Sequence, residues 1–308
     1  MEKQRRTKAK RINTLSMLLI AAPGIIYLLI NNYVPMAGLF IAFKNYKFKL
    51  GIFRSPWCGF DNFRFLFVSN DAWIITRNTL LYNLAFIAIG TIAALTVAIL
   101  LYELGQTIKA KFFQSALLFP HLVSWIIASY LFYALLNSSN GFINQSIMPL
   151  FNVETFDWYA EKKFWPFILL IVYLWKHTGY TAVVYLAGIS GINKELYEAA
   201  EIDGANRWKQ IFAITLPQLK PTIITMVLMA VGRVFYSDFG LFYQIPMDSG
   251  PLTSVTQTID TYVYRALMTS GNFALSSAAG FFQSVCGFVL ITIVNGLVRK
   301  ADPDNALF

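Results

Sequence analysis

The sequence predicts an all-α integral membrane protein with six transmembrane helices, and three observations support this fold class. Of the 308 residues, 56% are hydrophobic and only 13% are charged, whereas soluble domains average roughly 45–50% apolar and about 25% charged residues. The apolar residues gather into runs long enough to cross the hydrocarbon layer, which takes about 20 helical residues. The positive residues, which give a formal net charge of +9, lie mostly at the ends of these runs. This composition excludes a disordered tail and a disulfide-stapled miniprotein.

Six apolar runs meet the length criterion, and we expect spans at residues 15–42, 78–104, 112–136, 164–189, 222–245 and 276–298. Asn31, Asn32 and Pro35 interrupt the first run, which predicts a helix with a short outer extension. Residues 1–14 form a basic arm that is similar to the front of a signal peptide. We expect no cleavage, because the apolar run continues well beyond a signal core and no small-x-small site closes it. Pro120 should kink or delay the third span.

The distribution of Lys and Arg predicts that both chain ends lie in the cytoplasm. With the N-terminus inside, the inner segments hold 14 of these residues and the outer loops hold 9, and cytoplasmic loops carry the excess in membrane proteins. Six of the nine lie in the first outer loop, residues 43–77. This loop is either an outer structure of its own or a plain connection. Because there is no Gly/Ser linker or fixed-period repeat, residues 15–308 are expected to form one transmembrane domain after the cytoplasmic arm.

The longest polar segment predicted to be cytoplasmic, residues 190–221, contains the signals for two short helices between the fourth and fifth spans. The first is expected at residues 194–202, where Asn193 can cap it and Gly204 can stop it by adopting a positive φ. The second is an amphipathic helix from about residue 206 to residue 214. Two prolines are expected to break it before the fifth span, namely Pro217 and Pro221.

This loop also contains three short motifs, Glu198-Ala199-Ala200, Asp203-Gly204-Ala205 and Ile214-Thr215-Leu216-Pro217. Together they resemble the EAA loop of permease subunits in ABC importers. In that family the loop supplies a coupling helix that sits in a groove of a separate ATPase and transmits its closure to the membrane helices. The resemblance implies that the ATPase-coupling residues are Glu198, Ala199, Ala200, Asp203, Gly204, Ala205, Leu216 and Pro217. The alternative is an amphipathic loop lying on the inner leaflet.

Further motifs are spread along the chain: Tyr33-Val34-Pro35, Gly59-Phe60-Asp61-Asn62-Phe63, Trp175-Lys176, Gly179-Tyr180 and Asp260-Thr261-Tyr262. They resemble the maltose-importer-like carbohydrate permeases, in the branch associated with complex oligosaccharides and polysaccharide fragments. This implies a multi-pass subunit in the lipid bilayer of a bacterial plasma membrane. The implied partners are a second related permease in a heterodimer, two copies of a cytoplasmic ATPase and an extracellular solute-binding protein. Many relatives carry a Glu after the Phe of the fifth span, where this chain has Phe239-Gly240 with Asp238 before the Phe, so no role is carried over to that acid.

The sequence contains no G-x-x-x-x-G-K-[ST] loop, so we expect ATP and Mg²⁺ to be used by the partner ATPase and not by this chain. His121 and His177 have no Cys, His or carboxylate at metal-ligand spacing, and no nucleophile–base pair is evident. We therefore expect no metal, no cofactor and no catalysis on this chain. Nucleic-acid binding is not expected either, because positive residues at span ends are typical of topology signals.

Polar side chains inside the predicted spans are the candidates for the transport path. An ionisable residue at mid-membrane costs about 2.5–3.5 kcal/mol on insertion scales, so Lys176 and Arg233 should face a cavity or a partner. Aromatic platforms beside hydrogen-bonding groups also suit sugar rings. The candidates are Tyr130, Tyr133, Tyr173, Lys176, His177, Tyr180, Arg233 and Ser237. For the stripe at 173–180, the alternative is a satisfied hydrogen-bond network between helices.

Two other functions remain open from the sequence. An ABC importer permease for a non-sugar solute, such as a peptide or a polyamine, would carry the same cytoplasmic loop, because that loop contacts the ATPase and not the cargo. An ion-coupled secondary transporter would use Lys176, Arg233 and Asp238 as its coupling residues.

Overall fold

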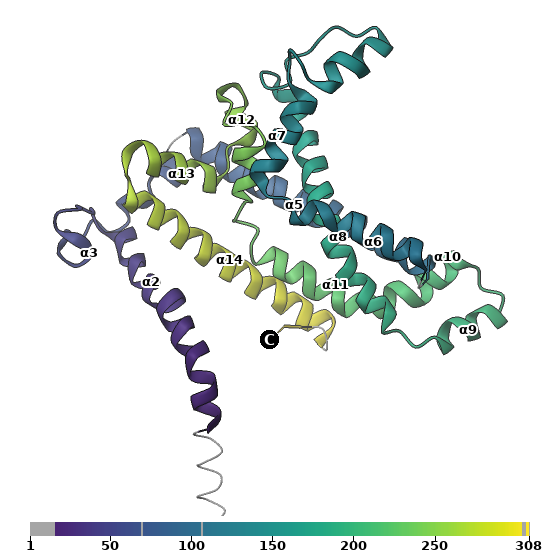
Figure 1. Ribbon diagram of the computed structural model, residues 1–308. Coiled ribbons are helices and arrows are strands. Elements are labelled where there is room, and N and C mark those ends of the chain that lie inside the picture. Colours follow the sequence, from purple (N-terminus) through teal and green to yellow (C-terminus); the bar gives the residue numbers. More distant parts are fainter. Residues whose placement is uncertain (1–15, 69, 106, 304–305, 308) are drawn as a thin grey trace, which may run out of the picture. The chain divides into compact units, whose positions relative to one another are not determined.

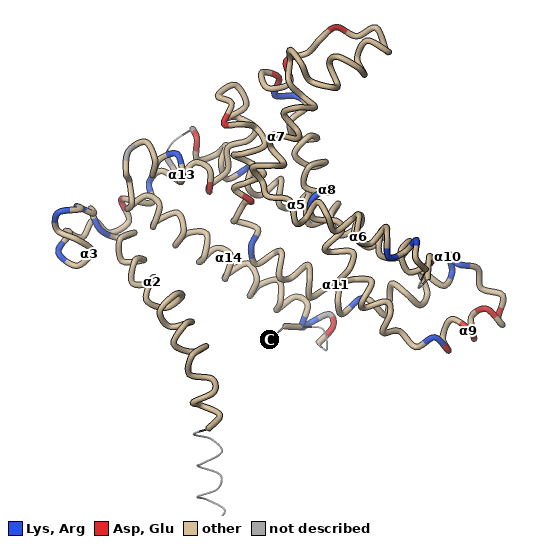
Figure 2. Tube along the Cα trace, in the orientation of Figure 1, with Lys and Arg blue, Asp and Glu red and all other residues tan. Residues whose placement is uncertain are grey.

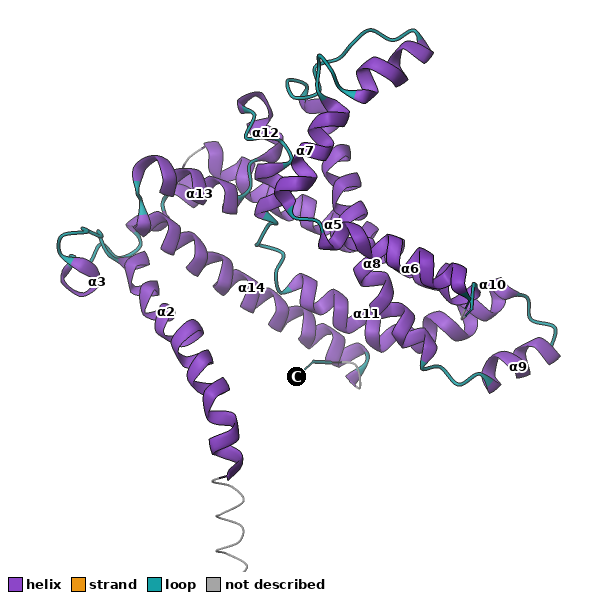
Figure 3. Cartoon of the chain, viewed as in Figure 1, coloured by secondary structure: helices purple, strands orange, loops and turns teal. Residues whose placement is uncertain are grey.

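The computed structural model describes residues 16–68, 70–105, 107–303 and 306–307 (Figure 1). Within these residues every regular element is helical, and the only extended pairing is an isolated antiparallel bridge between Lys44 and Trp57 (Figure 3). Five helices are long and apolar enough to cross a membrane, namely Ser16–Phe43, Asp71–Glu103, Lys162–Ser190, Arg207–Val231 and Phe273–Lys300. A sixth crossing results if the bent pair Ile108–Leu122 and Trp125–Leu136 counts as one span. The predicted helical membrane class is therefore confirmed.

Contacts divide the chain into two units. One comprises Met1–Arg64 with Ala266–Phe281, and the other comprises Phe65–Arg265 with Phe282–Phe308. Two helices, α13 (Ile259–Ser270) and α14 (Phe273–Ala301), run through the boundaries between these segments.

In the first unit, the span Ser16–Phe43 changes its helical hydrogen bonding at the predicted interruption without breaking. A π-helical turn, η1 (Leu29–Tyr33), contains both asparagines and is followed by α2 (Val34–Met36) and a 3-10 helix, η2 (Ala37–Phe43). Pro35 comes just after this π-helical turn, at a change of hydrogen-bond register that tolerates its missing N–H. The span consequently continues to Phe43 as one helix.

The segment that follows this span has a fold of its own. It contains α3 (Gly51–Arg54) and a 3-10 turn, η3 (Asp61–Phe63). The buried Lys44 donates from Nζ to the carbonyl oxygens of Ile52 and Phe53, both at 2.9 Å. The Asn62 amide closes the base of the segment by donating to the carbonyl oxygens of Ala42 and Lys44 at 2.8 and 2.9 Å. These bonds agree with a folded segment and not with a plain connection.

In the second unit, α8 (Trp165–Ser190) is the central helix. It packs along α5 (Asn70–Glu103) and against α6 (Ile108–Leu122). One buried cluster gathers around Trp165, Leu169 and Val172 of α8, and a second gathers around Ala182, Tyr185 and Ile189. Both clusters use one face of α8, because the buried positions recur at helical spacing.

The prediction that residues 112–136 form a single kinked helix is wrong. The chain bends by 100° between α6 and α7 (Trp125–Leu136). Pro120 lies in the last turn of α6, Val123 and Ser124 are extended, and the Ser124 hydroxyl caps α7 by accepting from the Ile127 N–H at 3.3 Å. α6 continues two residues past Pro120, and the Ser124 cap starts a new helix in a new direction.

The fifth predicted span, residues 222–245, is also wrong in its bounds. The helix begins earlier with α10 (Arg207–Gln210), passes through a π-helical turn, η7 (Ile211–Thr215), and ends with α11 (Leu216–Val231). The chain is then irregular up to a second π-helical turn, η8 (Gly240–Gln244). Arg233 therefore lies beyond the end of α11 and not at the centre of a span.

The prolines after the short second helix do not break it, contrary to expectation. In η7 the Leu216 N–H donates to the Ile211 carbonyl oxygen, five residues back. This change of register places Pro217 in the first turn of α11, where no N–H is required. Pro221 lies inside α11, and the helix continues through it to Val231.

Candidate functional site

The loop between α8 and α11 has the two predicted helical pieces. The first, α9 (Glu195–Ile202), starts where the Asn193 Oδ1 accepts from the Glu195 N–H at 3.1 Å. Gly204 follows with φ of +74°, a conformation that costs residues with a Cβ roughly 1–2 kcal/mol. Asn206 then caps α10 by accepting from the Lys209 N–H at 2.9 Å. Asn206 is thus the N-cap of α10, whereas the N-cap of α9 is Lys194 without a side-chain bond, and the expected cap Asn193 lies one position earlier.

This loop presents an exposed and chemically mixed surface. Charged residues of both signs lie along α9 and α10 (Figure 2). Among the predicted coupling residues, Glu198, Ala199, Asp203, Gly204 and Pro217 are exposed, and Ala200, Ala205 and Leu216 are partly buried. Large apolar side chains are exposed beside them, including Ile202 at 87%, Trp208 at 70% and Phe212 at 64%. An open groove of about 640 Å³ runs from Gly204 along Trp208 and Phe212.

The loop is tied back to the membrane helices by three interactions. The Tyr197 hydroxyl of α9 lies 2.9 Å from the Thr215 hydroxyl of η7. Arg207 lies 3.4 Å from the Glu201 carboxylate and 3.7 Å from the carboxylate of Glu103, at the end of α5. Burial raises the pKa of Tyr197, so its hydroxyl stays protonated and able to donate. These contacts join α9 and α10 to η7 and to the end of α5.

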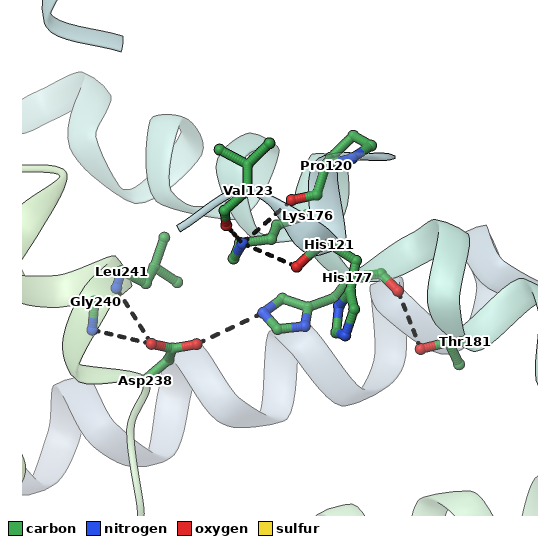
Figure 4. Close-up of polar contacts among 9 residues, drawn as sticks. All are labelled: Pro120, His121, Val123, Lys176, His177, Thr181, Asp238, Gly240 and Leu241. Carbon is green, nitrogen blue, oxygen red and sulfur yellow. Dashed lines mark hydrogen bonds and ion pairs between the residues drawn. The ribbon is translucent and has the colours of Figure 1, made fainter. Parts of the chain in front are cut away.

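A second polar cluster lies where α8 passes the break between α6 and α7 (Figure 4). The Lys176 Nζ, on a side chain that is 5% exposed, donates to the carbonyl oxygens of Pro120 at 3.2 Å, His121 at 3.4 Å and Val123. The ammonium also lies 4.8 Å from the centre of the Trp125 ring. Lys176 contacts main-chain carbonyls here, which agrees with the hydrogen-bond network that was the alternative to a path-lining role.

The neighbouring His177 connects α8 to the irregular segment before η8. Its Nε2 lies 3.7 Å from the Asp238 Oδ2. The other carboxylate oxygen of Asp238 accepts from the N–H groups of Gly240 and Leu241 at 3.0 and 3.4 Å, so Asp238 caps the start of η8 (Figure 4). Asp238 therefore has a structural role that sequence reasoning did not assign.

The irregular residues 232–239 are hydrogen-bonded by side chains from three other helices. The Asn83 amide of α5 donates to the carbonyl oxygens of Val234 and Tyr236, at 3.0 and 2.9 Å. The Gln283 amide of α14 donates to the Phe235 carbonyl oxygen at 2.7 Å. The Asp260 carboxylate of α13 accepts from the Ser237 N–H and hydroxyl at 2.7 and 2.8 Å.

Hydrogen bonds from protein side chains are required wherever irregular backbone lies at membrane depth, because lipid offers the main chain no hydrogen-bond partner. Sequence reasoning missed Asn83, Gln283 and Asp260 as partners of this segment. The available signal was an amide side chain within an apolar run, as at Asn83 and Gln283.

The eight predicted path residues do not form one group. Tyr173, Lys176, His177 and Tyr180 lie on α8, where the Tyr180 ring stacks 4.6 Å from the His121 ring. A cavity of about 180 Å³ adjoins Tyr173 and His177. Tyr130 and Tyr133 are exposed on α7, Arg233 is exposed beyond the end of α11, and Ser237 bonds to Asp260. The structure brings together the four α8 residues and leaves the other four outside that group.

Known proteins resemble this chain over most of its length. Residues 87–305 match the family model described as "Binding-protein-dependent transport system inner membrane component". The chain is 33% identical over 299 residues to the polygalacturonan/rhamnogalacturonan transport system permease protein YteP of Bacillus subtilis (strain 168), covering 97% of this chain and 92% of that protein. It is 34% identical over 296 residues to protein LplB of the same organism, covering 96% and 92%.

A solved structure is similar along the whole chain. It belongs to a bacterial ABC transporter involved in the import of the acidic polysaccharide alginate. The TM-score is 0.85 and the sequence identity is 29%, with 97% of this chain and 99% of that chain covered.

Proposed function

The chain belongs to the family of binding-protein-dependent transport system inner membrane components, and from this premise we propose that it is a permease subunit of an ATP-driven carbohydrate importer. One relative by sequence is named for polygalacturonan/rhamnogalacturonan transport, and one similar structure is described as involved in the import of the acidic polysaccharide alginate. We assign this chain a cargo of oligosaccharides or polysaccharide fragments, in the plasma membrane of a bacterium. The observation that carries the proposal is the capped two-helix loop with its exposed apolar groove beside Gly204.

The proposed topology has six crossings, with α6 and α7 together forming the third. An even number of crossings places both chain ends on one side, and the excess of Lys and Arg favours the cytoplasm for that side. The loop of residues 190–221 then lies in the cytoplasm, where a soluble ATPase can reach it. Its coupling residues are the eight named from the sequence: Glu198, Ala199, Ala200, Asp203, Gly204, Ala205, Leu216 and Pro217.

In the proposed mechanism, the ATPase pair closes on ATP and Mg²⁺, and its grooves move α9 together with the turn at Gly204. The movement passes directly into α8 and α11, and through Arg207 into the end of α5. A second permease subunit completes the pathway between the two chains, and an extracellular solute-binding protein delivers the sugar. The polar and aromatic residues of α7, α8 and the segment after α11 are the proposed lining, comprising Tyr130, Tyr133, Tyr173, His177, Tyr180, Arg233 and Ser237. Lys176, the eighth candidate from the sequence, donates to main-chain carbonyls instead.

The first experiment is a gentle-detergent purification of the tagged chain from its native membrane, with its companions identified by mass spectrometry. We expect an ATPase, a second permease and a solute-binding protein. Liposomes containing that complex should take up oligogalacturonides only with internal ATP. A chain that purifies alone and transports on a proton or sodium gradient would overturn the proposal. A complex that moves a peptide or polyamine but no sugar would overturn the cargo assignment alone.

A further inference from the structure

The break between α6 and α7 leaves main-chain carbonyl groups in need of hydrogen-bond donors inside the membrane. α6 ends at Leu122 and the next two residues are extended, so the i to i+4 hydrogen bonds of a continuous span stop here, and of the last carbonyls the one of Pro120 keeps a main-chain donor, the Val123 N–H at 3.3 Å. Within the hydrocarbon layer water does not supply these partners, and each unsatisfied carbonyl is costly. Some group from elsewhere in the chain must therefore donate to them.

Lys176 of α8 is that group. A lysine ammonium has three N–H donors, and the Lys176 ammonium meets three carbonyl oxygens, those of Pro120, His121 and Val123 (Figure 4). Its positive charge lies at the negative end of the α6 dipole and over the face of the Trp125 ring. All three donors are used by the main chain, which leaves none for a sugar hydroxyl or carboxylate in this conformation.

The contacts around this lysine bring three parts of the chain together. Trp125, at the start of α7, packs so closely on Gly240 that a Cβ there would overlap the indole ring. The Gly240 N–H donates to Asp238 Oδ1, and the Asp238 Oδ2 lies 3.7 Å from the Nε2 of His177 on α8. His177 is the next residue after Lys176, so α8, the break and η8 approach one another around this lysine.

A second close approach makes the α6–α8 contact rigid. Gly179 lies one turn after Lys176, and a Cβ there would overlap the main chain of α6 at Leu117. With α8 held to α6 by steric contact at Gly179 and by polar contact at Lys176, the two helices cannot slide past one another without breaking both. α8 ends at Ser190, only a few residues before α9.

We propose that Lys176 is a positioning residue that makes the α6–α7 break move together with α8 when the coupling loop is displaced. This inference rests on the proposed importer function. It reassigns Lys176 from the pathway to the transmission of motion. Tyr130 and Tyr133 on α7 would then change position with each ATPase cycle, because α7 is fixed to α8 through this lysine.

The test uses the complete importer in liposomes with its solute-binding protein, comparing Lys176→Met with Lys176→Arg and with Lys162→Met. Lys162 is exposed in the 3-10 turn before α8, so its variant controls for loss of a lysine. The readout is the number of sugar molecules moved per ATP hydrolysed. We expect Lys176→Met to lower this ratio about tenfold, while its ATPase rate stays within about twofold of the parent. Lys176→Arg should recover most of the ratio, because it keeps the charge and the donors.

A lysine with only a structural role would reduce the yield of folded complex and leave that ratio unchanged in the surviving molecules, and this result would overturn the inference. Hydrogen exchange of the amides at residues 121–127 gives a second readout that needs no transport. We expect about tenfold faster exchange in Lys176→Met and no change in Lys162→Met. Unchanged exchange would refute the capping role itself. If the parent complex moves sugar without ATP, the proposed function fails, and the exchange result still decides the role of Lys176 at the break.

Discussion

The contact between α14 and the end of α11 provides a steric test of the fold. Gly287 of α14 is buried against Gly232, the first residue after α11. A Cβ added at Gly287 would lie 2.6 Å from the Gly232 carbonyl oxygen, whereas ordinary van der Waals contact begins at 3.4 Å. Gly287→Ala therefore requires the two segments to separate by about 0.8 Å, because a main-chain carbonyl cannot rotate aside as a flexible side chain does.

This separation also weakens a hydrogen bond one turn away. Gln283 donates to the Phe235 carbonyl oxygen at 2.7 Å, and the same shift would lengthen that bond to about 3.5 Å, the limit of a useful contact. Overpacking costs about 1–3 kcal/mol, and a weakened buried hydrogen bond adds about 1 kcal/mol. We expect a total of about 2–4 kcal/mol, which corresponds to a fall in Tm of roughly 3–6 °C for a chain of this size.

The assay is thermal unfolding of the tagged complex in mild detergent, followed by the fraction that stays soluble on gel filtration. Gly296→Ala is the matched control, since Gly296 lies in the same helix with no atom within 4 Å of an added Cβ. Alanine there should leave Tm unchanged or raise it slightly, because a helix interior favours Ala over Gly by about 1 kcal/mol. If both variants unfold at the parent temperature, or both fall equally, the packing of α14 on Gly232 is refuted.

Three further predictions concern other parts of the chain. Gly204→Asp should abolish uptake while leaving insertion and yield normal, because it places a Cβ and a charge at a residue whose φ is +74°. Gly204→Asn tests the effect of the charge separately. Normal uptake by the Asp variant would contradict the proposed coupling role of this glycine. Asn144→Leu should speed proteolysis between residues 137 and 164, since the buried Asn144 amide bonds to Asn137, Ser138, Phe156 and Trp158; equal cleavage rates in parent and variant would count against it. Asn83→Leu should lower stability by about 2 kcal/mol in the same thermal assay, because two carbonyls after α11 lose their donor. Thr96→Val, which removes a hydroxyl bonded only within α5, is its control and should have little effect.

The parts of the fold that the sequence predicted well are those with local causes. The second, fourth and sixth spans follow uninterrupted apolar runs, and the observed helices Asp71–Glu103, Lys162–Ser190 and Phe273–Lys300 include or closely match the expected ranges. The two helices and the glycine turn of residues 190–221 were also well predicted, because Asn193, Gly204 and Asn206 act on residues no more than a few positions away. The error at Pro217 arose because a π-helical turn, which no composition rule indicates, precedes it.

The two helix breaks were missed because their stabilising partners are distant in the sequence. Nothing in residues 232–239 indicates that Asn83 and Gln283 will bond to their main chain. The apolar composition of the third span likewise hides a 100° bend whose exposed carbonyls are bonded by Lys176, more than 50 residues later. Periodicity counts examine one segment at a time, whereas a break in lipid is stable only if another segment supplies donors.

This dependence changes how a polar residue in an apolar run should be interpreted. Lys176 was correctly identified from the sequence as too costly to face lipid, but the expected relief was a wet pathway or a partner subunit. The observed relief is the backbone of a broken helix within the same chain, and Asn83 and Gln283 serve the second break in the same way. A polar side chain within a span is therefore evidence for irregular backbone elsewhere in the bundle as much as for a pathway. The two roles differ in a measurable way, because substitution of a pathway residue should change which sugar is moved, whereas Lys176→Met should change the number of sugar molecules moved per ATP.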